Sequence, residues 1–136
     1  MNAEPLSLAA VLSSGEPERL YSGLSALVST AADGSRCAGL LAFRALDLFL
    51  DPDLLRRVQE PEATPALAWA GREMFAHSLV ELRDTAVDLE TLSLHACSAS
   101  VETMNLTAED VEDRLDGVLS TPRFLELARG SRLIFV

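Results

Sequence analysis

The chain has little of what a disulfide scaffold, a metal centre or a nucleic-acid interface requires. It contains two cysteines and two histidines in 136 residues, too few for the disulfide framework of a small secreted domain and without the ligand spacing of a zinc site. It has 11 basic and 21 acidic residues, which give a net charge of −10. Nucleic acid and anionic membranes both select for basic residues, so we expect neither as a partner, and no metal.

Long apolar runs and a leader are also missing. No window approaches the roughly 20 apolar residues of a membrane-spanning helix. The opening MNAEPLSLAAVLSSGEPER has no basic region before its apolar stretch and no convincing cleavage site. Hydrophobic residues nevertheless make up 49% of the chain, which argues against disorder, and the length suffices to bury a core. We predict one cytoplasmic domain over residues 1–136, with its thiols reduced.

Short apolar runs alternate with segments of helical periodicity. Five runs bounded by turn residues are expected to form strands, over residues 6–12, 36–43, 91–98, 115–119 and 131–136. The longest helix is expected over 65–84, with an apolar stripe of Leu67, Ala70 and Met74 that Phe75, Leu79 and Leu82 widen. His77 is expected to lie half-buried beside this stripe. Shorter helices are expected over 16–31, 53–58, 99–104, 108–113 and 122–128. Thr107 is expected to cap the fourth of these and Ser120 or Thr121 the fifth, and RALDLFLDP is expected to form a short helical turn. This alternation predicts an α/β fold with a five-stranded, mostly parallel sheet.

Cys97, in the segment LHACSAS, stands where the third expected strand gives way to a helix. Ligands of open α/β sheets bind beyond the carboxyl ends of the strands, and a helix start offers free N–H groups and a positive dipole end. Both favour thiolate over thiol, and Ser98 and Ser100 add hydroxyls within one turn. Two interpretations stay open: a reactive thiolate that attacks sulfur, or a small buried hydrophobe. Cys37 begins the second strand, at the opposite end, and is predicted to be a packed thiol.

Four further residues are candidates for the same edge of the sheet. His95 shares a strand face with Cys97 and either supports the thiolate or is a hydrogen-bonded core histidine. Arg44 follows the second strand and either holds an anion or forms a surface salt bridge. Ser14 and Gly15 follow the first strand and form either an anion-binding nest or an ordinary turn in which Ser14 caps the next helix.

The order of motifs from His95 onward is distinctive. HACSASVETMNLTAEDVEDRLDGV is followed by PRFLELA and RLIFV, and the front half has a strand leading to SSG and then LLAFRAL. This pattern resembles the DsrE/DsrF-like family of sulfur-relay proteins (TusD and YchN types) over nearly the whole chain. That family has an ACxxS segment at the end of a strand, then an acidic stretch, a helix and a final apolar strand. Asn105 stands where the family usually has Gly, and both accept a left-handed cap.

The resemblance implies a three-layer α/β/α sandwich, a homo-oligomer (dimer, trimer or hexamer) and no cofactor. It also implies a cysteine that carries sulfur as a persulfide, and Cys97 matches that position. Partners would be sulfur-donor and sulfur-acceptor proteins or small sulfane-sulfur compounds. In this interpretation Cys97 is the persulfide carrier. Three neighbours assist it, namely His95, Ser98 and Ser100. Three other residues bind the substrate, namely Ser14, Gly15 and Arg44.

A different class of function remains as the alternative. The chain could be a non-catalytic oligomeric module that binds a small anion or a protein partner, with Cys97 merely tolerated in a turn of small residues. A thiol–disulfide oxidoreductase is disfavoured, because Ser100 occupies the position of the second cysteine in a C-x-x-C motif. Reactivity of Cys97 separates the sulfur carrier from the binding module.

Overall fold

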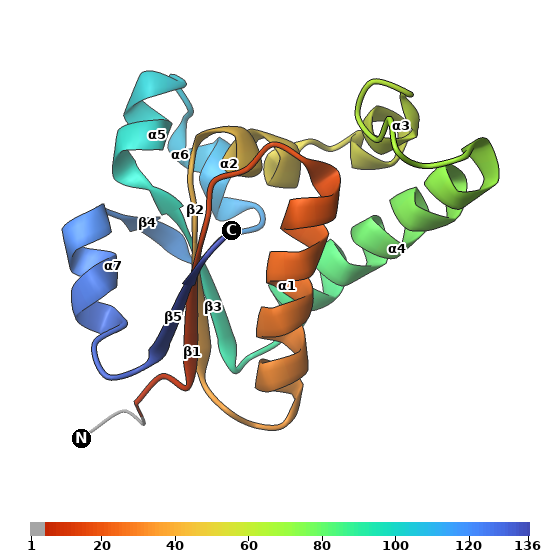
Figure 1. The fold of residues 1–136 in the computed structure, drawn as a ribbon. Helices are drawn as coiled ribbons and strands as arrows, with labels where there is room; N and C mark the ends of the chain where they lie inside the picture. Colours follow the sequence, from red (N-terminus) through yellow and green to blue (C-terminus); the bar gives the residue numbers. More distant parts are fainter. Residues whose placement is uncertain (1–4) are drawn as a thin grey trace.

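Five parallel strands form the centre of the molecule (Figure 1). The computed structural model describes residues 5–136. The strands stand in the order β4-β3-β2-β1-β5, and every neighbouring pair is parallel. Their bounds are Leu8–Leu12 (β1), Cys37–Leu41 (β2), Leu92–Cys97 (β3), Gly117–Leu119 (β4) and Arg132–Phe135 (β5). The predicted five-stranded sheet is therefore confirmed, and it is parallel throughout.

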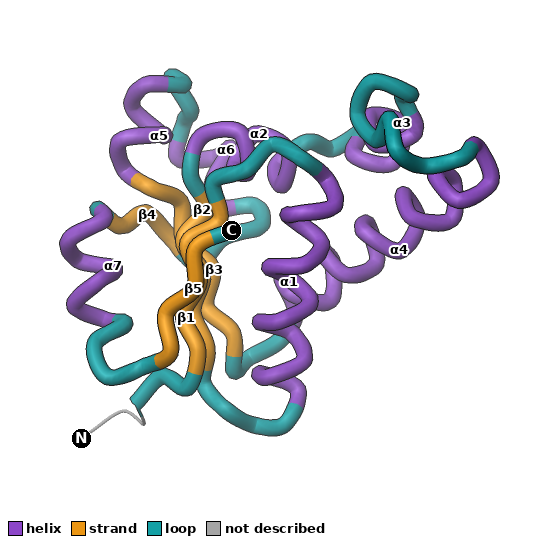
Figure 2. Tube along the Cα trace, viewed as in Figure 1, coloured by secondary structure: helices purple, strands orange, loops and turns teal. Residues whose placement is uncertain are grey.

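Helices cover both faces of this sheet, so the three-layer α/β/α sandwich is confirmed (Figure 2). The long helices α1 (Pro17–Ala32) and α4 (Trp69–Asp88) lie on one face, and α7 (Thr121–Leu127) lies on the other. Four short helices complete the set: α2 (Phe43–Leu50), α3 (Leu54–Gln59), α5 (Ser98–Thr103) and α6 (Ala108–Glu112). Within residues 5–136 no helix combines the length and apolar character needed to cross a membrane.

The two faces bury cores of very different size. The larger core joins the sheet to α1, α2, α3 and α4, and it contains Phe49, one of two fully buried phenylalanines. The smaller core lies under α7, with Phe124 at its centre, and includes Leu40 of β2 and Cys97 of β3. Strands β1 and β2 are buried on both faces because each lies between two strands and between two layers.

The apolar stripe predicted for the long helix was wrong around Met74 but correct further along, where Leu79 is buried and Phe75 and Leu82 pack against the larger core. The helix begins at Trp69 rather than residue 65, and Met74 is 72% exposed. The first turns of α4 extend past the sheet beside α3 (Figure 1), and Trp69 and Met74 are exposed there. His77, expected to be half-buried, is exposed, although its neighbour Ala76 is buried in the larger core. The buried face of α4 lies further along and consists of Ala76, Leu79, Arg83 and Ala86.

The turn chemistry expected at helix ends is largely present. Thr107 caps α6 through a reciprocal pair of hydrogen bonds with Asp110. Asn105 has a φ of 55°, the left-handed conformation predicted for it. The cap assigned to Ser14 was wrong, because Glu16 is the N-cap of α1 and the Ser14 hydroxyl accepts the Glu16 N–H at 3.1 Å. RALDLFLDP, expected to form a short helical turn, contributes to the two-turn helix α2.

Candidate functional site

Cys97 lies where the sequence placed it, as the last residue of β3 and the N-cap of α5. Its backbone is extended, with φ −66° and ψ 126°, so the chain turns into the helix immediately after it. The side chain points into the smaller core beside α7 and is only 4% exposed. The thiol is therefore sheltered from bulk water yet adjacent to the free N–H groups of a helix start.

Burial and nearby hydrogen-bond donors shift the pKa of Cys97 in opposite directions. Burial raises the pKa of the Cys97 thiol, but the neighbouring donors, namely the Ser100 N–H and hydroxyl, the Ala99 N–H and the Thr121 hydroxyl, lower it further than burial raises it. The net pKa therefore lies below the ordinary value for cysteine. Donors that favour the charged form of a group outweigh its desolvation when several of them converge on it.

Thr121 is the member of this set that sequence reasoning missed. It is the first residue of α7, directly after β4, and Leu119 of β4 pairs with Cys97 across the sheet. The two helix starts therefore lie beside the same thiol. The available signal was the predicted helix start at residues 120–122, but linking it to Cys97 required the strand order, which the sequence did not provide.

Ser100 ties the site to the next strand. It is fully buried, and its Oγ accepts the backbone N–H of Phe43 at 2.9 Å. Phe43 follows β2 with a φ of 46°, a left-handed conformation that is costly for an aromatic residue. Strained residues of this kind persist where the surrounding structure holds them, and they cluster at functional sites. The Ser100 hydroxyl can thus donate to Cys97 while accepting from Phe43.

His95 lies on the same face of β3 as Cys97, as predicted, because Leu94 and Ala96 point into the larger core instead. Its Nδ1 atom is buried and has no hydrogen-bond partner among residues 5–136, unlike that of a fully hydrogen-bonded core histidine. Burial lowers the pKa of His95, and the nearby Asp116 carboxylate opposes this only in part. The imidazole is therefore neutral at pH 7.

The three predicted substrate-binding residues come together at the same edge of the sheet. Ser14, Gly15 and Arg44 line a cleft of about 600 Å³, here called the serine–arginine cleft, together with Ser13, Glu16, Asp47, Arg57, Glu62 and Ala63. The stem of Arg44 lies so close to Gly15 that a Cβ there would come within 2.8 Å of the Arg44 Cβ. Glycine at this position therefore lets the arginine lie against the loop.

Arg44 also lines a second hollow. This space of about 330 Å³, here called the Phe43 hollow, is formed by Phe43, Arg44, Asp47 and Met104. It shares Arg44 and Asp47 with the serine–arginine cleft and extends from them toward the end of α5. Cys97 lines neither space. Its connection to them runs through Ser100, which accepts the Phe43 N–H.

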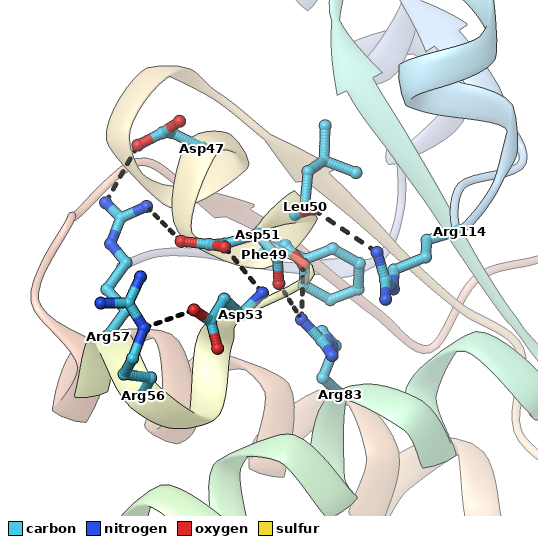
Figure 3. A network of polar contacts seen from close by, with 9 residues as sticks. All are labelled: Asp47, Phe49, Leu50, Asp51, Asp53, Arg56, Arg57, Arg83 and Arg114. Carbon is cyan, nitrogen blue, oxygen red and sulfur yellow. Dashed lines mark hydrogen bonds and ion pairs between the residues drawn. The ribbon is translucent and has the colours of Figure 1, made fainter. Parts of the chain in front are cut away.

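The other end of α2 is held by arginines (Figure 3). Arg83 is buried in α4 and donates to the carbonyl oxygens of Phe49 and Asp51, at 3.2 and 2.8 Å. Arg114 donates to the Leu50 carbonyl at 3.4 Å. Burial and the neighbouring Arg114 lower the pKa of Arg83. Cations at a helix C-terminus satisfy its free carbonyls and complement its dipole, so this network fixes the helix that presents Phe43 and Arg44.

The remaining sequence candidates are placed apart from these contacts. Ser98 is half-buried at the start of α5 and is not among the groups that lower the pKa of Cys97. Cys37 is buried at the amino end of β2, opposite Leu8 and Leu92, as predicted for a packed thiol. Burial raises its pKa. Among residues 5–136 no three side chains of the metal-ligating types form a group that could hold a metal ion.

Comparison of the chain with models of protein families yields no match, and neither does comparison with curated proteins. The resemblance to sulfur-relay proteins thus stays a prediction from the residues themselves. The fold and the site define a parallel α/β/α sandwich with a cysteine of lowered pKa at the carboxyl edge of its sheet.

Proposed function

We propose that the protein is a sulfur carrier that accepts sulfane sulfur on Cys97 and passes it on. The observation that supports this most directly is the set of donors around one thiol, from the starts of α5 and α7, which lowers the pKa of Cys97 despite its burial. A thiolate is the form that attacks sulfur. Cys37, equally buried, has no such set, and its pKa is raised.

The proposed reaction is two exchanges at divalent sulfur. The Cys97 thiolate bonds to the outer sulfur of a donor persulfide R–S–SH, the donor S–S bond breaks, and R–S⁻ leaves. An acceptor thiolate then attacks the outer sulfur of Cys97–S–SH and regenerates the Cys97 thiolate, with no net oxidation. The donors that favour the thiolate would favour the persulfide anion as well. We assign His95 to take the thiol proton, and Ser98 to assist from the first turn of α5.

The setting of this chemistry is proposed on general grounds. Donors and acceptors would be proteins or small sulfane-sulfur compounds, and a reducing cytoplasm would keep both cysteines free. Association into a homo-oligomer is supported by apolar side chains left exposed on α7 and on the edge strand β5, namely Leu125, Leu127, Leu133 and Phe135. Exposed apolar groups of this kind favour contact with another protein surface.

One observation favours the alternative, a non-catalytic module that binds a small anion or a protein. The Cys97 side chain is 4% exposed, whereas a carrier must let donor and acceptor reach its sulfur. In a binding module the serine–arginine cleft would be the functional feature and Cys97 a packing residue. Replacement of Cys97 by serine would then leave ligand or partner binding unchanged.

Sulfur uptake decides between the two functions. We would incubate the wild type, Cys97→Ser and Cys37→Ser with a sulfane-sulfur donor and measure intact mass. A carrier gains about 32 Da per sulfur atom in the wild type and in Cys37→Ser, and none in Cys97→Ser. No adduct on folded wild type, or an adduct that persists in Cys97→Ser and disappears in Cys37→Ser, would exclude the carrier.

A further inference from the structure

The charges that line the serine–arginine cleft are only partly matched by one another. Arg57 pairs with Asp47 at 2.9 Å and with Asp51 at 3.2 Å (Figure 3). Glu16 pairs with Arg19 at 3.3 Å.

Two opposite charges remain. Neither Arg44 nor Glu62 has an ion-pair partner within 4 Å among residues 5–136, although both line the cleft. The cleft thus presents one unmatched guanidinium and one unmatched carboxylate, from the start of α2 and from the segment between α3 and α4.

This charge pattern selects among small ligands. The cleft has three carboxylates and two guanidiniums in its lining, and the whole chain carries a net charge of −10. A simple anion would meet Arg44 but would be repelled by Glu62 and by the overall field. A zwitterion has a negative group for Arg44 and a positive group for Glu62, and it is neutral overall. The cleft volume of about 600 Å³ is typical of a small-molecule site.

We propose that the serine–arginine cleft binds a small zwitterionic α-amino acid or short peptide, with its carboxylate on Arg44 and its ammonium group on Glu62. The backbone N–H groups of Ser14 and Gly15, which have no acceptor among residues 5–136, offer further donors to the carboxylate. A side chain anchored in this way extends along the Phe43 hollow, which shares Arg44 with the cleft and reaches Met104 beyond α5.

A zwitterion site identifies the class of sulfur donor for the proposed carrier. Only the transfer of sulfur rests on the proposed function. The donor would be an amino acid or peptide persulfide such as cysteine persulfide, whose outer sulfur has to move from the cleft to Cys97, since that thiol does not line the cleft. Cys97–S⁻ and R–S–SH give Cys97–S–SH and R–S⁻, so one S–S bond forms, one breaks, and the amino acid leaves as its thiolate. Binding of the zwitterion itself requires no reaction and can be measured separately.

The binding test uses the inert probe S-methylcysteine and the full chain with Cys97→Ser, so that no sulfur chemistry intervenes. Arg44→Gln and Glu62→Gln should each raise the Kd of S-methylcysteine by about tenfold, as expected for loss of one charge-assisted contact. The matched controls Arg129→Gln and Glu126→Gln alter exposed charges on and after α7 and should leave the Kd unchanged.

Two modified probes assign each contact. The methyl ester of S-methylcysteine lacks the carboxylate, so Arg44→Gln should not weaken it further. N-acetyl-S-methylcysteine lacks the ammonium group, so Glu62→Gln should not weaken it further. Absence of saturable binding, or a Kd that neither substitution changes, would overturn the zwitterion site.

A parallel measurement separates this inference from the sulfur-carrier proposal. Wild type, Arg44→Gln and Glu62→Gln are incubated with low concentrations of cysteine persulfide, and the mass adduct on Cys97 is followed over time. Uptake slowed by about tenfold in both variants supports the donor assignment. Uptake at the wild-type rate in both overturns it but leaves the carrier intact. No uptake in any chain, with S-methylcysteine still bound, overturns the carrier and leaves the zwitterion site.

Discussion

Two buried thiols in one sheet have opposite character in this protein. Cys37 lies at the amino end of β2 and Cys97 at the carboxyl end of β3, and both are nearly inaccessible to solvent. Burial raises the pKa of each, but at Cys97 donors from two helix starts lower it below the ordinary value. At Cys37 the thiol donates to the Ser35 carbonyl at 3.7 Å, a contact that favours the neutral form. Position relative to the sheet edges, rather than burial, separates the two thiols.

The largest effect on this contrast is expected from Ser100→Ala. The substitution removes a hydroxyl donor to Cys97 and leaves the buried N–H of Phe43 without its acceptor, at a cost of about 1–3 kcal/mol in the free energy of unfolding. We expect a lower urea midpoint and a higher pKa for Cys97, measured as the pH midpoint of alkylation in a Cys37→Ser background. Ser29→Ala, at an exposed serine of α1 far from the site, is the matched control and should leave the Cys97 midpoint unchanged. A Cys97 midpoint unaffected by Ser100→Ala would contradict the role assigned to this hydroxyl.

A second test uses the dependence of stability on pH. The folded-state pKa of Cys97 is depressed, so its stabilising contribution is present above the unfolded thiol pKa of roughly 8.5 and is lost as pH falls through the folded value. The folded-state pKa of Cys37 is raised, so its contribution is present below roughly 8.5 and is lost as pH rises through the folded value.

Urea unfolding between pH 6 and 10 should therefore show opposite effects of the two substitutions. In Cys97→Ser, the free energy of unfolding should rise less, or fall more, with increasing pH than it does in the wild type. In Cys37→Ser, it should fall less, or rise more, with increasing pH than it does in the wild type. Two variants with the same pH slope would show that the thiols do not differ as described.

The smallest effect is expected from Thr121→Val, which removes one hydroxyl while keeping the shape of the side chain. Thr121 is exposed, so the free energy of unfolding should change by no more than about 0.5 kcal/mol. The alkylation midpoint of Cys97 should still rise, by less than in Ser100→Ala, because the Ser100 hydroxyl lowers the pKa of Cys97 more than the Thr121 hydroxyl does. A midpoint equal to that of the wild type would mean that the start of α7 does not act on this thiol.

Much of the fold could be predicted because its signals are local. Apolar runs bounded by turn residues marked all five strands, and Thr107 and Asn105 marked their helix cap and left-handed turn. The stripe around Met74 failed because periodicity shows that a helix has an apolar face, not what lies against it. The start of α4 extends beyond the sheet beside α3, and the helix packs against the main core only from Phe75 onward.

The candidate site likewise has a part that could be predicted from the sequence and a part that could not. The position of Cys97 at a strand end followed from the residues around it, as did the shared face of His95. Thr121 could not be linked to Cys97, because that contact depends on β4 lying beside β3 with Leu119 opposite the cysteine. Arg83 was equally hidden, since its acceptors are carbonyl groups more than thirty residues away.

By itself the sequence determined the alternation of strands and helices, the parallel sheet that follows from it, and a cysteine at the carboxyl end of a strand. Only the tertiary structure decided the strand order, the two helix starts that meet at that cysteine, and the unmatched pair of Arg44 and Glu62 in one cleft. The physical reason is the separation along the chain over which each kind of interaction acts. Caps, turns and periodicity act within a few residues, whereas hydrogen bonds and charges at a site depend on segments that packing alone brings together.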